Sequence, residues 1–412
     1  MSELINVNKL WRQDFTLLLL YITSGNFAAA VFSIALSFLV LKLTGSPGKM
    51  AITMGLNLLP NIIRPFSATF FDRVNFKIPV IVLNIIGGFL LIFLYFYLSK
   101  HSVSISVVYF VVFLNSLVVA IYDPALPKLI PFVISKKFIT KAMGILTTSN
   151  STTQMCGLLF GGILVSFFGE KQIILFYGIS CILVTIFLFF VEMPKISVQE
   201  RMLQNKFFYD FIEGIKVTLS KKNILFFCIT AFLIDAVFAP LKVLFPLYMA
   251  KIGKGEIGFG LLMTFFTGGC ILGGFLIAVF GSKIKDLNGV AVALLIFSSS
   301  FLGLLIFKSY NELLLFMLII GVAVGMINTY IIVLIQKTIP FTFLSRAIGF
   351  CNTCANLGSP IVLFLLTGVI HKITLNEVFL CSLVLSVIFL FKWLFNIGVM
   401  NNYVKQPEKV AL

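Results

Sequence analysis

The chain has 412 residues, of which 60% are hydrophobic and only 11% charged, and its formal net charge is +16. Soluble domains carry about 25% charged residues, and a soluble chain of this length would need more polar residues to cover its outside. This composition excludes a soluble globular protein. Apolar stretches of about 18–25 residues recur without alternation of polar and apolar positions, so we predict membrane-spanning helices rather than a β-barrel.

Twelve such stretches follow one another along the chain, joined mostly by short loops that are polar or contain glycine or proline. The spans are predicted at 14–41, 50–71, 79–99, 104–127, 142–167, 172–192, 223–249, 257–280, 289–307, 312–337, 347–370 and 376–397. The connection at 193–222 is the long one. Within it Phe207, Phe211 and Ile215 recur every four residues, which predicts an amphipathic helix on the inner leaflet, as a linker or a regulatory element.

The distribution of basic residues predicts the orientation in the membrane. The polar N-terminal stretch MSELINVNKLWRQD lacks a cleavage site and leads directly into a span, so we expect no signal peptide. With a cytoplasmic N-terminus, most of the 31 lysines and arginines fall in loops that face inward. This bias predicts a multi-pass protein of the cell membrane with both termini in the cytoplasm. The surplus charge then reflects orientation and attraction to anionic lipid, and no Lys/Arg-rich run indicates nucleic-acid binding.

Cysteine and histidine give no sign of a metal site or a cofactor. All seven cysteines fall within predicted spans, and the CxxC formed by Cys351 and Cys354 has no second ligand pair. His101 and His371 lie in short loops expected to face outward. We therefore expect the thiols to serve in packing.

Two segments of the chain recur about half a chain length apart. LIPFVISKKFITKAMGILTT (129–148) resembles TIPFTFLSRAIGFCNT (338–353), and ITSGNFAAAVF (22–32) resembles ITAFLIDAVF (229–238). Both copies have the same predicted orientation, which indicates two six-helix halves related by a parallel repeat. The predicted domains are an N-terminal half at 1–192, a cytoplasmic linker at 193–222 and a C-terminal half at 223–412.

Six plus six spans in parallel repeat is the architecture of major facilitator transporters. The loop after the second span, ATFFDRVNFK, resembles the motif G-x-x-x-D-R-x-x-R-K of that superfamily, with Ala68 in place of glycine and Phe76 in place of one basic residue. Segments 123–131, 207–225 and 334–349 resemble its macrolide-efflux and siderophore-exporter branch. The resemblance implies an all-α membrane fold of twelve helices that moves a small molecule, and it covers nearly the whole chain.

In this family the loop after the second helix helps to close the cytoplasmic face in the outward-facing state. The resemblance therefore implies a conformational switch made by Asp72, Arg73 and Lys77. A carboxylate such as that of Asp72 is stabilised at the N-terminus of a helix. A helix is predicted to begin near Arg346 and would offer such an N-terminus. The alternative is that these charges only set the topology at the end of a helix.

Charged residues inside spans are rare and are candidates for function. Arg64 lies about two turns inside the second predicted span, where it can bind an anion, hold an acid or extend towards water. Asp235 lies in the apolar run FLIDAVFAPLKVLF, and such surroundings favour a neutral carboxyl group that exchanges protons. Lys242 follows at nearly the same azimuth but about 10 Å further along the axis, so we expect desolvation to dominate at Asp235. Asp123, before Pro124, is the second candidate for proton coupling.

Uncharged polar residues also recur within the predicted spans. Each is more often an interhelical hydrogen bond than a ligand contact, but together they are candidates for lining a substrate cavity with Arg64 and Lys242. These residues are Asn26, Asn57, Gln154, Asn328 and Asn352. GxxxG patterns at 157–161, 269–273 and 321–325 predict close contacts between helices.

Three functions remain open from the sequence. The first is export of amphipathic small molecules, such as drugs, macrolides or siderophores, driven by protons through alternating access. The second is import of a polar or anionic solute held by Arg64 and Lys242. The third, a membrane enzyme, would need a catalytic constellation within the spans, and no histidine lies there. We expect a monomeric bacterial transporter with a small-molecule substrate, protons and membrane lipid as its partners.

Overall fold

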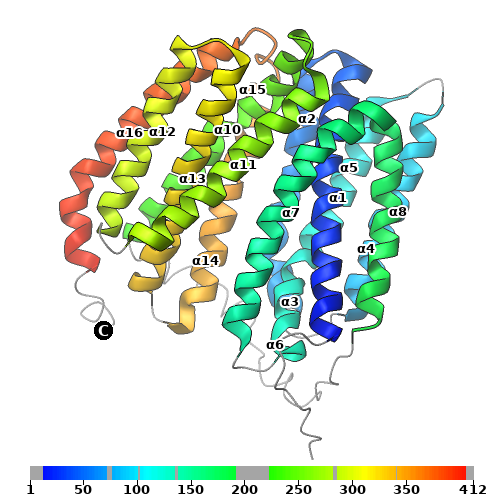
Figure 1. Cartoon of the computed structure of the whole chain (residues 1–412), viewed down its shortest axis with the longest axis horizontal. Coiled ribbons are helices and arrows are strands. Elements are labelled where there is room, and N and C mark those ends of the chain that lie inside the picture. Colours follow the sequence, from blue (N-terminus) through cyan, green and yellow to red (C-terminus); the bar gives the residue numbers. More distant parts are fainter. Residues whose placement is uncertain are drawn as a thin grey trace, which may run out of the picture. The chain divides into compact units, whose positions relative to one another are not determined.

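The computed structural model describes residues 13–71, 77–100, 103–134, 138–191, 222–281, 285–339 and 341–404. Within these ranges the regular elements are all helical (Figure 1). Those up to residue 191 are α1 (Gln13–Thr44), α2 (Pro47–Leu58), η1 (Leu59–Ile63), α3 (Arg64–Phe71), α4 (Lys77–Leu98), α5 (Ile105–Tyr122), η2 (Asp123–Leu129), α6 (Ile130–Val133), α7 (Ile139–Phe168) and α8 (Glu170–Phe189). Those from residue 222 are α10 (Lys222–Lys251), α11 (Gly255–Phe280), α12 (Asp286–Ile306), α13 (Tyr310–Thr338), α14 (Phe341–Asn356), α15 (Gly358–Leu366) and α16 (Leu375–Val404).

Eleven helices of the described residues are long and apolar enough to cross a membrane. Each coincides with a predicted span. The remaining predicted span, 50–71, falls on α2, η1 and α3, which follow one another without a gap. Pro60 is the second residue of the 3₁₀ segment η1, and its missing N–H and fixed φ interrupt the α-helical hydrogen bonds. The prediction of an all-α membrane protein is confirmed, and the twelve-helix count is consistent with these elements.

The chain divides into two compact units. Unit 1 comprises Met1–Gly45, Leu56–Asn205 and Gly255–Gly260, and unit 2 comprises Ser46–Gly55, Lys206–Lys254 and Leu261–Leu412. In unit 1, α1 packs against both α7 and α8, while α4 packs against α5 and α8. In unit 2, α10 packs against α14 and α15, while α12 packs against α13 and α16. In both units the first helix thus pairs with the fifth, and the third pairs with the fourth and the sixth, as expected of a repeat. The first helix packs closely on the sixth in unit 1 only.

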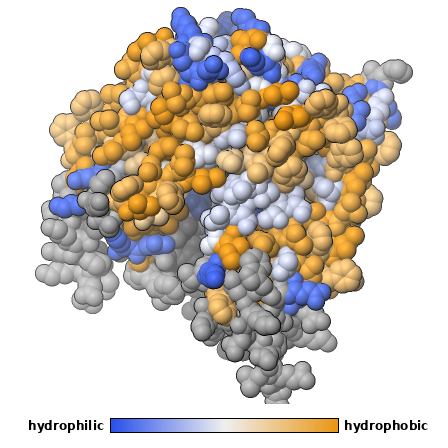
Figure 2. All heavy atoms as spheres, viewed as in Figure 1, coloured by the Kyte–Doolittle hydropathy of each residue, from blue (hydrophilic) through white to orange (hydrophobic). Residues whose placement is uncertain are grey.

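The outer surfaces of the helices are apolar. Large exposed hydrophobic side chains gather on the helices that come third and sixth in each half, for example Phe89 and Phe96 of α4 and Phe391 and Phe395 of α16. Figure 2 shows that apolar residues dominate the sides of the helices on the face in view. In water such surfaces would aggregate, so they are the surfaces that contact lipid.

The glycine patterns of the C-terminal half bring α11 and α13 close together. A Cβ atom at Gly269 or Gly273 would lie 2.1 Å from the carbonyl oxygen of Leu318 or 2.2 Å from that of Val322. From the other side, a Cβ at Gly321 would lie 2.1 Å from the carbonyl oxygen of Phe266. Only glycine permits this approach of two backbones, so the predicted close contact is confirmed.

Candidate functional site

The acid inside an apolar helix of the C-terminal half is surrounded by hydrogen-bond donors. Asp235 lies in the middle of α10, where Nζ of Lys242 donates a hydrogen bond of 3.0 Å to its Oδ1. The same ammonium group donates to Oγ of Ser359 at 2.6 Å. The backbone N–H of Ser359 donates to the second carboxylate oxygen of Asp235 at 2.7 Å. These contacts join α10 to α15 through three residues.

A break between two helices provides the donor from α15. Leu357 separates α14 from α15, and Gly358, Ser359 and Pro360 begin the new helix. The first N–H groups of a helix have no partner within it and carry partial positive charge. A Cβ at Gly358 would lie 2.4 Å from the carbonyl oxygen of Phe232, so glycine is needed for α15 to approach α10 this closely. Asp235 therefore occupies an anion-binding position at the N-terminus of α15.

The expected separation of Asp235 and Lys242 is wrong, because their charged groups form an ion pair at 3.0 Å. Side chains of an α-helix lean towards its N-terminus, and the four-carbon stem of Lys242 spans the rise that separates the two Cα atoms. Lys242 and the N-terminus of α15 thus supply hydrogen-bond donors to both oxygens of the Asp235 carboxyl group. The side chain of Asp235 is 26% exposed and that of Lys242 is 35% exposed, so the carboxyl group is accessible from outside the helix bundle of unit 2.

A second ion pair inside the apolar region lies in unit 1. Nη2 of Arg64, at the start of α3, is 3.2 Å from Oδ2 of Asp123, at the start of η2. Arg64 directly follows the 3₁₀ segment η1, and Asp123 begins the 3₁₀ segment η2 directly after α5. Oγ of Ser67 on α3 donates a hydrogen bond to the carbonyl oxygen of Ala120 on α5. Arg64 thus holds an acid, which is one of the roles open to it from the sequence. Its buried Nε has no hydrogen-bond partner among the described residues.

The three residues of the implied conformational switch are only partly described. Asp72 and Arg73 lie outside the described residues, as does the predicted amphipathic linker helix. Lys77 begins α4, and its ammonium group donates to the carbonyl oxygens of Phe189 at 2.8 Å and Val191 at 2.5 Å. Phe189 is the last residue of α8 and Val191 lies just beyond it, where a cation is favoured by the helix dipole.

The uncharged polar candidates have different surroundings. Nδ2 of Asn26 donates to Oδ1 of Asn150 at 3.0 Å and so links α1 to α7. The backbone carbonyl of Asn57, next to the break of the second span, accepts a hydrogen bond from Ser116. Side chains exposed within a span favour contact with water over contact with lipid. Exposed side chains of this kind are Gln154 on α7, Asn328 on α13 and Asn352 on α14.

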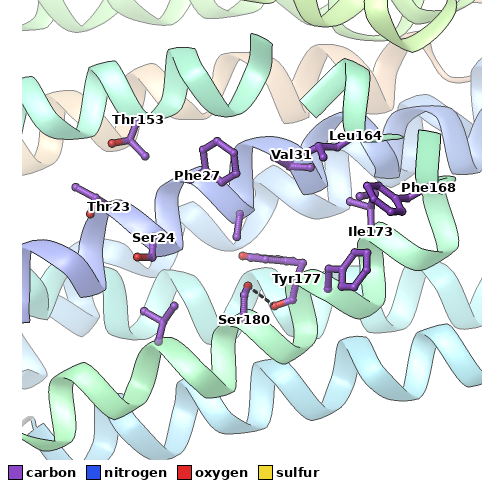
Figure 3. A pocket seen from close by; sticks show the side chains of 13 residues that line it. Thr23, Ser24, Phe27, Val31, Thr153, Leu164, Phe168, Ile173, Tyr177 and Ser180 are labelled. Atoms are coloured by element: carbon purple, nitrogen blue, oxygen red, sulfur yellow. Dashed lines mark hydrogen bonds between the residues drawn. The ribbon is translucent and has the colours of Figure 1, made fainter. Parts of the chain in front are cut away.

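An elongated groove in unit 1 was not predicted from the sequence. It has a volume of about 630 Å³ and lies on α1 between α7 and α8. Its lining runs from Thr23 to Val31 on α1, from Thr153 to Phe168 on α7 and from Ile173 to Val184 on α8. Figure 3 shows the side chains of Thr23, Ser24 and Thr153 around its polar end. Serine and threonine residues within apolar spans were the only sign of the groove in the sequence. Sequence spacing cannot show that such residues on three different helices face one groove.

An ion cluster joins three segments at the opposite end of unit 1 from residue 13. Nζ of Lys42, near the end of α1, lies 2.5 Å from Oε1 of Glu170 and 2.8 Å from Oε1 of Glu256. Glu170 begins α8, and Glu256 lies in the first turn of α11. Both carboxylate side chains are largely buried, with 12% and 14% of their surface exposed. One ammonium group therefore contacts both carboxylates and offsets part of their charge, which is favourable only while all three segments stay together.

Comparison with known proteins identifies the family. The sequence model of the Major Facilitator Superfamily matches residues 16–253 and 227–410. The chain belongs to the Major Facilitator Superfamily. It is therefore a multi-pass membrane transporter, and its family is one of transporters rather than enzymes.

Curated relatives are efflux proteins of bacteria. Macrolide efflux protein A of Streptococcus pyogenes is 23% identical over 361 residues, which cover 86% of this chain and 88% of that protein. Macrolide efflux protein A of Enterococcus faecalis is 22% identical over 293 residues, covering 70% and 90%. The resemblance to the macrolide-efflux branch is confirmed.

Solved structures share the fold at low identity. The nucleoside transporter NupG matches with a TM-score of 0.74 at 12% identity, covering 93% of this chain and 99% of that chain. A bacterial homolog of the human lysosomal transporter Spinster, in an inward-facing and unoccupied conformation, matches with a TM-score of 0.71 at 14% identity, covering 96% and 97%. A D-xylose–proton symporter matches with a TM-score of 0.69 at 12% identity, covering 92% and 97%. At these identities the similarity establishes the fold alone.

Proposed function

We propose that the chain exports amphipathic small molecules across the bacterial cell membrane by alternating access, in exchange for protons. Support for export comes from the efflux relatives, which align over most of both chains. Support for proton coupling comes from one observation, the carboxylate of Asp235 held between Lys242 and the N-terminus of α15. The transporter acts as a monomer with both termini in the cytoplasm.

Protonation of Asp235 would change the contact between α10 and α15. A neutral carboxyl group loses its ion pair with Lys242 and its attraction to the helix N-terminus. Lys242 is then an uncompensated cation in an apolar segment, which is costly until the cation reaches water or another acceptor. Movement of α15 relative to α10 would relieve this cost, so proton binding and release can favour different conformations.

The alternative, import of an anionic solute, has less support. It requires Arg64 and Lys242 to offer free positive charge to the solute. Both are paired with carboxylates, Asp123 at 3.2 Å and Asp235 at 3.0 Å. An anion would have to displace an acid that is already in place, at the cost of leaving that acid unpaired.

Transport in inverted membrane vesicles tests the proposal. A compound panel that includes erythromycin and a polar anion is offered with and without an imposed pH gradient, acidic inside. We expect the vesicles to concentrate erythromycin only when the gradient is present. Uptake of the polar anion by right-side-out vesicles, with no movement of erythromycin in either orientation, would favour import. Equal accumulation with and without the gradient would exclude protons as the driving ion.

A further inference from the structure

We propose that the groove of α1, α7 and α8 binds the uncharged part of an amphipathic molecule that enters from the bilayer. This inference rests on the proposed export function and assigns a binding site to its substrate. None of the residues that line the groove is charged. A ligand there is held by apolar contact and hydrogen bonds, and any charged group it carries must lie outside.

The arrangement of the helices explains why the groove opens sideways. α7 and α8 are joined through the single residue Gly169, yet they contact each other little. α7 packs mainly on α1, whereas α8 packs on both α1 and α4. Gly157 and Gly161 hold α7 tightly on α1, since a Cβ at Gly157 would lie 2.8 Å from the carbonyl oxygen of Phe27. The two helices thus leave α1 uncovered between them, and Figure 1 shows α1 in the gap between α7 and α8.

The rim of the groove is a surface that contacts lipid. Phe168 and Phe176, which line it, are about half exposed, and their rings pack edge to face at a centroid distance of 5.8 Å. Phe160 on α7 and Leu183 on α8 are similarly exposed beside it. A molecule dissolved among the acyl chains can therefore reach the groove without crossing water.

Hydroxyl groups in the lining distinguish the groove from a binding site for a lipid acyl chain. Thr23 and Ser180 satisfy their hydroxyls on carbonyls of their own helices, Leu19 and Tyr177. Ser24 on α1 and Thr153 on α7 have no hydrogen-bond partner among the described residues, and both line the groove (Figure 3). Figure 2 shows a weakly polar area over α7 and α1 within the apolar surface. Unpaired hydroxyls in hydrocarbon are unfavourable, so a ligand with acceptor oxygens fits better than an alkyl chain.

The size of the groove agrees with a drug-sized ligand. Its volume of about 630 Å³ lies within the usual range for small-molecule pockets, about 300–1,000 Å³. Its walls are aromatic at the end of Phe168 and Phe176, and in between the ring of Tyr177 stacks on Phe32 with centroids 4.7 Å apart. An apolar body would lie against the aromatic wall, with its acceptor groups towards Ser24 and Thr153.

Site-specific photo-crosslinking tests the site without relying on transport. A benzophenone amino acid replaces Phe176 in the groove or, as a control, Phe93 on α4, which does not line it, in the purified full-length protein. The two native side chains are 51% and 55% exposed, so they meet lipid to a similar extent. The protein is placed in nanodiscs of phosphatidylethanolamine and phosphatidylglycerol with tritiated erythromycin. We expect an erythromycin adduct at position 176 that excess unlabelled erythromycin suppresses, and lipid adducts at position 93.

Removing the two hydroxyls provides a second measurement. Ser24→Ala with Thr153→Val keeps the shape of the groove and should raise the erythromycin concentration for half-maximal labelling about tenfold, as expected for two lost hydrogen bonds. Ser33→Ala with Thr147→Val removes two hydroxyls from the same helices outside the groove and should change nothing, since these hydroxyls bond to Ala30 and Met143 of their own helices.

The outcomes of these measurements can refute the binding site without refuting the transport function, and the converse. Lipid adducts alone at both positions would make the groove an acyl-chain site, and equal erythromycin labelling at both would make it nonspecific partitioning. Either result overturns the proposal, as does an unchanged dose dependence after loss of both hydroxyls. Specific labelling in a protein that exports no erythromycin would support the site and refute the transport function. Export of erythromycin with no specific labelling would support the transport function and refute the site.

Discussion

The carboxyl group of Asp235 is the residue on which the proton hypothesis depends. It accepts hydrogen bonds from Lys242 and from the backbone of Ser359, so in the proposed mechanism its charge influences the contact between α10 and α15. Asparagine has a similar shape but can neither ionise nor exchange a proton. We expect Asp235→Asn to fold and to bind substrate, because its amide can still accept the N–H of Ser359.

Asp235→Asn should reduce accumulation against a gradient to background while substrate exchange down a gradient persists. Both are measured in proteoliposomes with the pH gradient as the sole energy source. Asp286→Asn is the matched control, because Asp286 pairs with Lys337 in the same unit but at a helix end. It should transport normally. If Asp235→Asn still concentrates substrate, Asp235 is structural and Asp123 becomes the candidate for coupling.

Sequence alone could identify which residues of the candidate site carry charge but not which of them meet. Asp235 and Arg64 stand out because charges in apolar runs are rare. Ser359 does not stand out, since serine is common in spans and its contribution to Asp235 comes from a backbone N–H. The groove could not be predicted from the sequence either, because its lining combines residues of three helices that only packing brings together.

At the scale of the helices, hydropathy could predict the spans but not their interruptions. Apolar length identifies a span because the bilayer core sets the number of residues needed to cross it. The 3₁₀ segment at Leu59–Ile63 and the break at Leu357 depend on local backbone geometry. Pro60 and Gly358 hint at both breaks, yet proline and glycine also occur within unbroken spans, as Pro240 and Pro246 do in α10.

Two neighbouring glycines of α11 should respond differently to the same substitution. A Cβ at Gly273 would lie 2.2 Å from the carbonyl oxygen of Val322, whereas at Gly274 the nearest atom is Oγ1 of Thr329 at 3.7 Å. We expect Gly273→Ala to separate α11 from α13 and to cost about 1–3 kcal/mol of stability.

Thermal unfolding in detergent measures this difference. Gly273→Ala should lower the midpoint by several degrees, and Gly274→Ala should leave it unchanged or raise it, because alanine favours the helix. Equal midpoints for the two variants would show that the contact between α11 and α13 is not tight.

At the scale of the whole molecule, the orientation in the membrane is still a prediction from basic residues. It places Ser46 and Gly255 outside the cell and Ser197 inside. In a background without native cysteines, Ser46→Cys and Gly255→Cys should react with a membrane-impermeant maleimide added to intact cells. Ser197→Cys should react only after the cells are opened. Reaction of Ser197→Cys alone from outside would reverse the orientation.

The Lys42 cluster should influence the balance between conformations. α11 begins in unit 1 and continues in unit 2, and the pair of Lys42 with Glu256 ties its first turn to α1. A change that moves α11 with unit 2 must break this pair, while the pair of Lys42 with Glu170 can persist. Partly exposed pairs contribute about 1 kcal/mol or less, so Glu256→Gln should change the ratio of conformations by up to about fivefold.

Spin labels at Gln172 and Lys254 can measure this balance as a distance distribution. Glu256→Gln should increase the population with the longer distance, because a neutral amide attracts Lys42 less strongly than a carboxylate does. Glu170→Gln is the control, since it removes the partner that stays in unit 1 and leaves Glu256 paired. It should leave the distribution as in the wild type or shift it towards the shorter distance, because Lys42 then serves Glu256 alone. If both variants lengthen the distance equally, the cluster stabilises unit 1 as a whole and does not select between conformations.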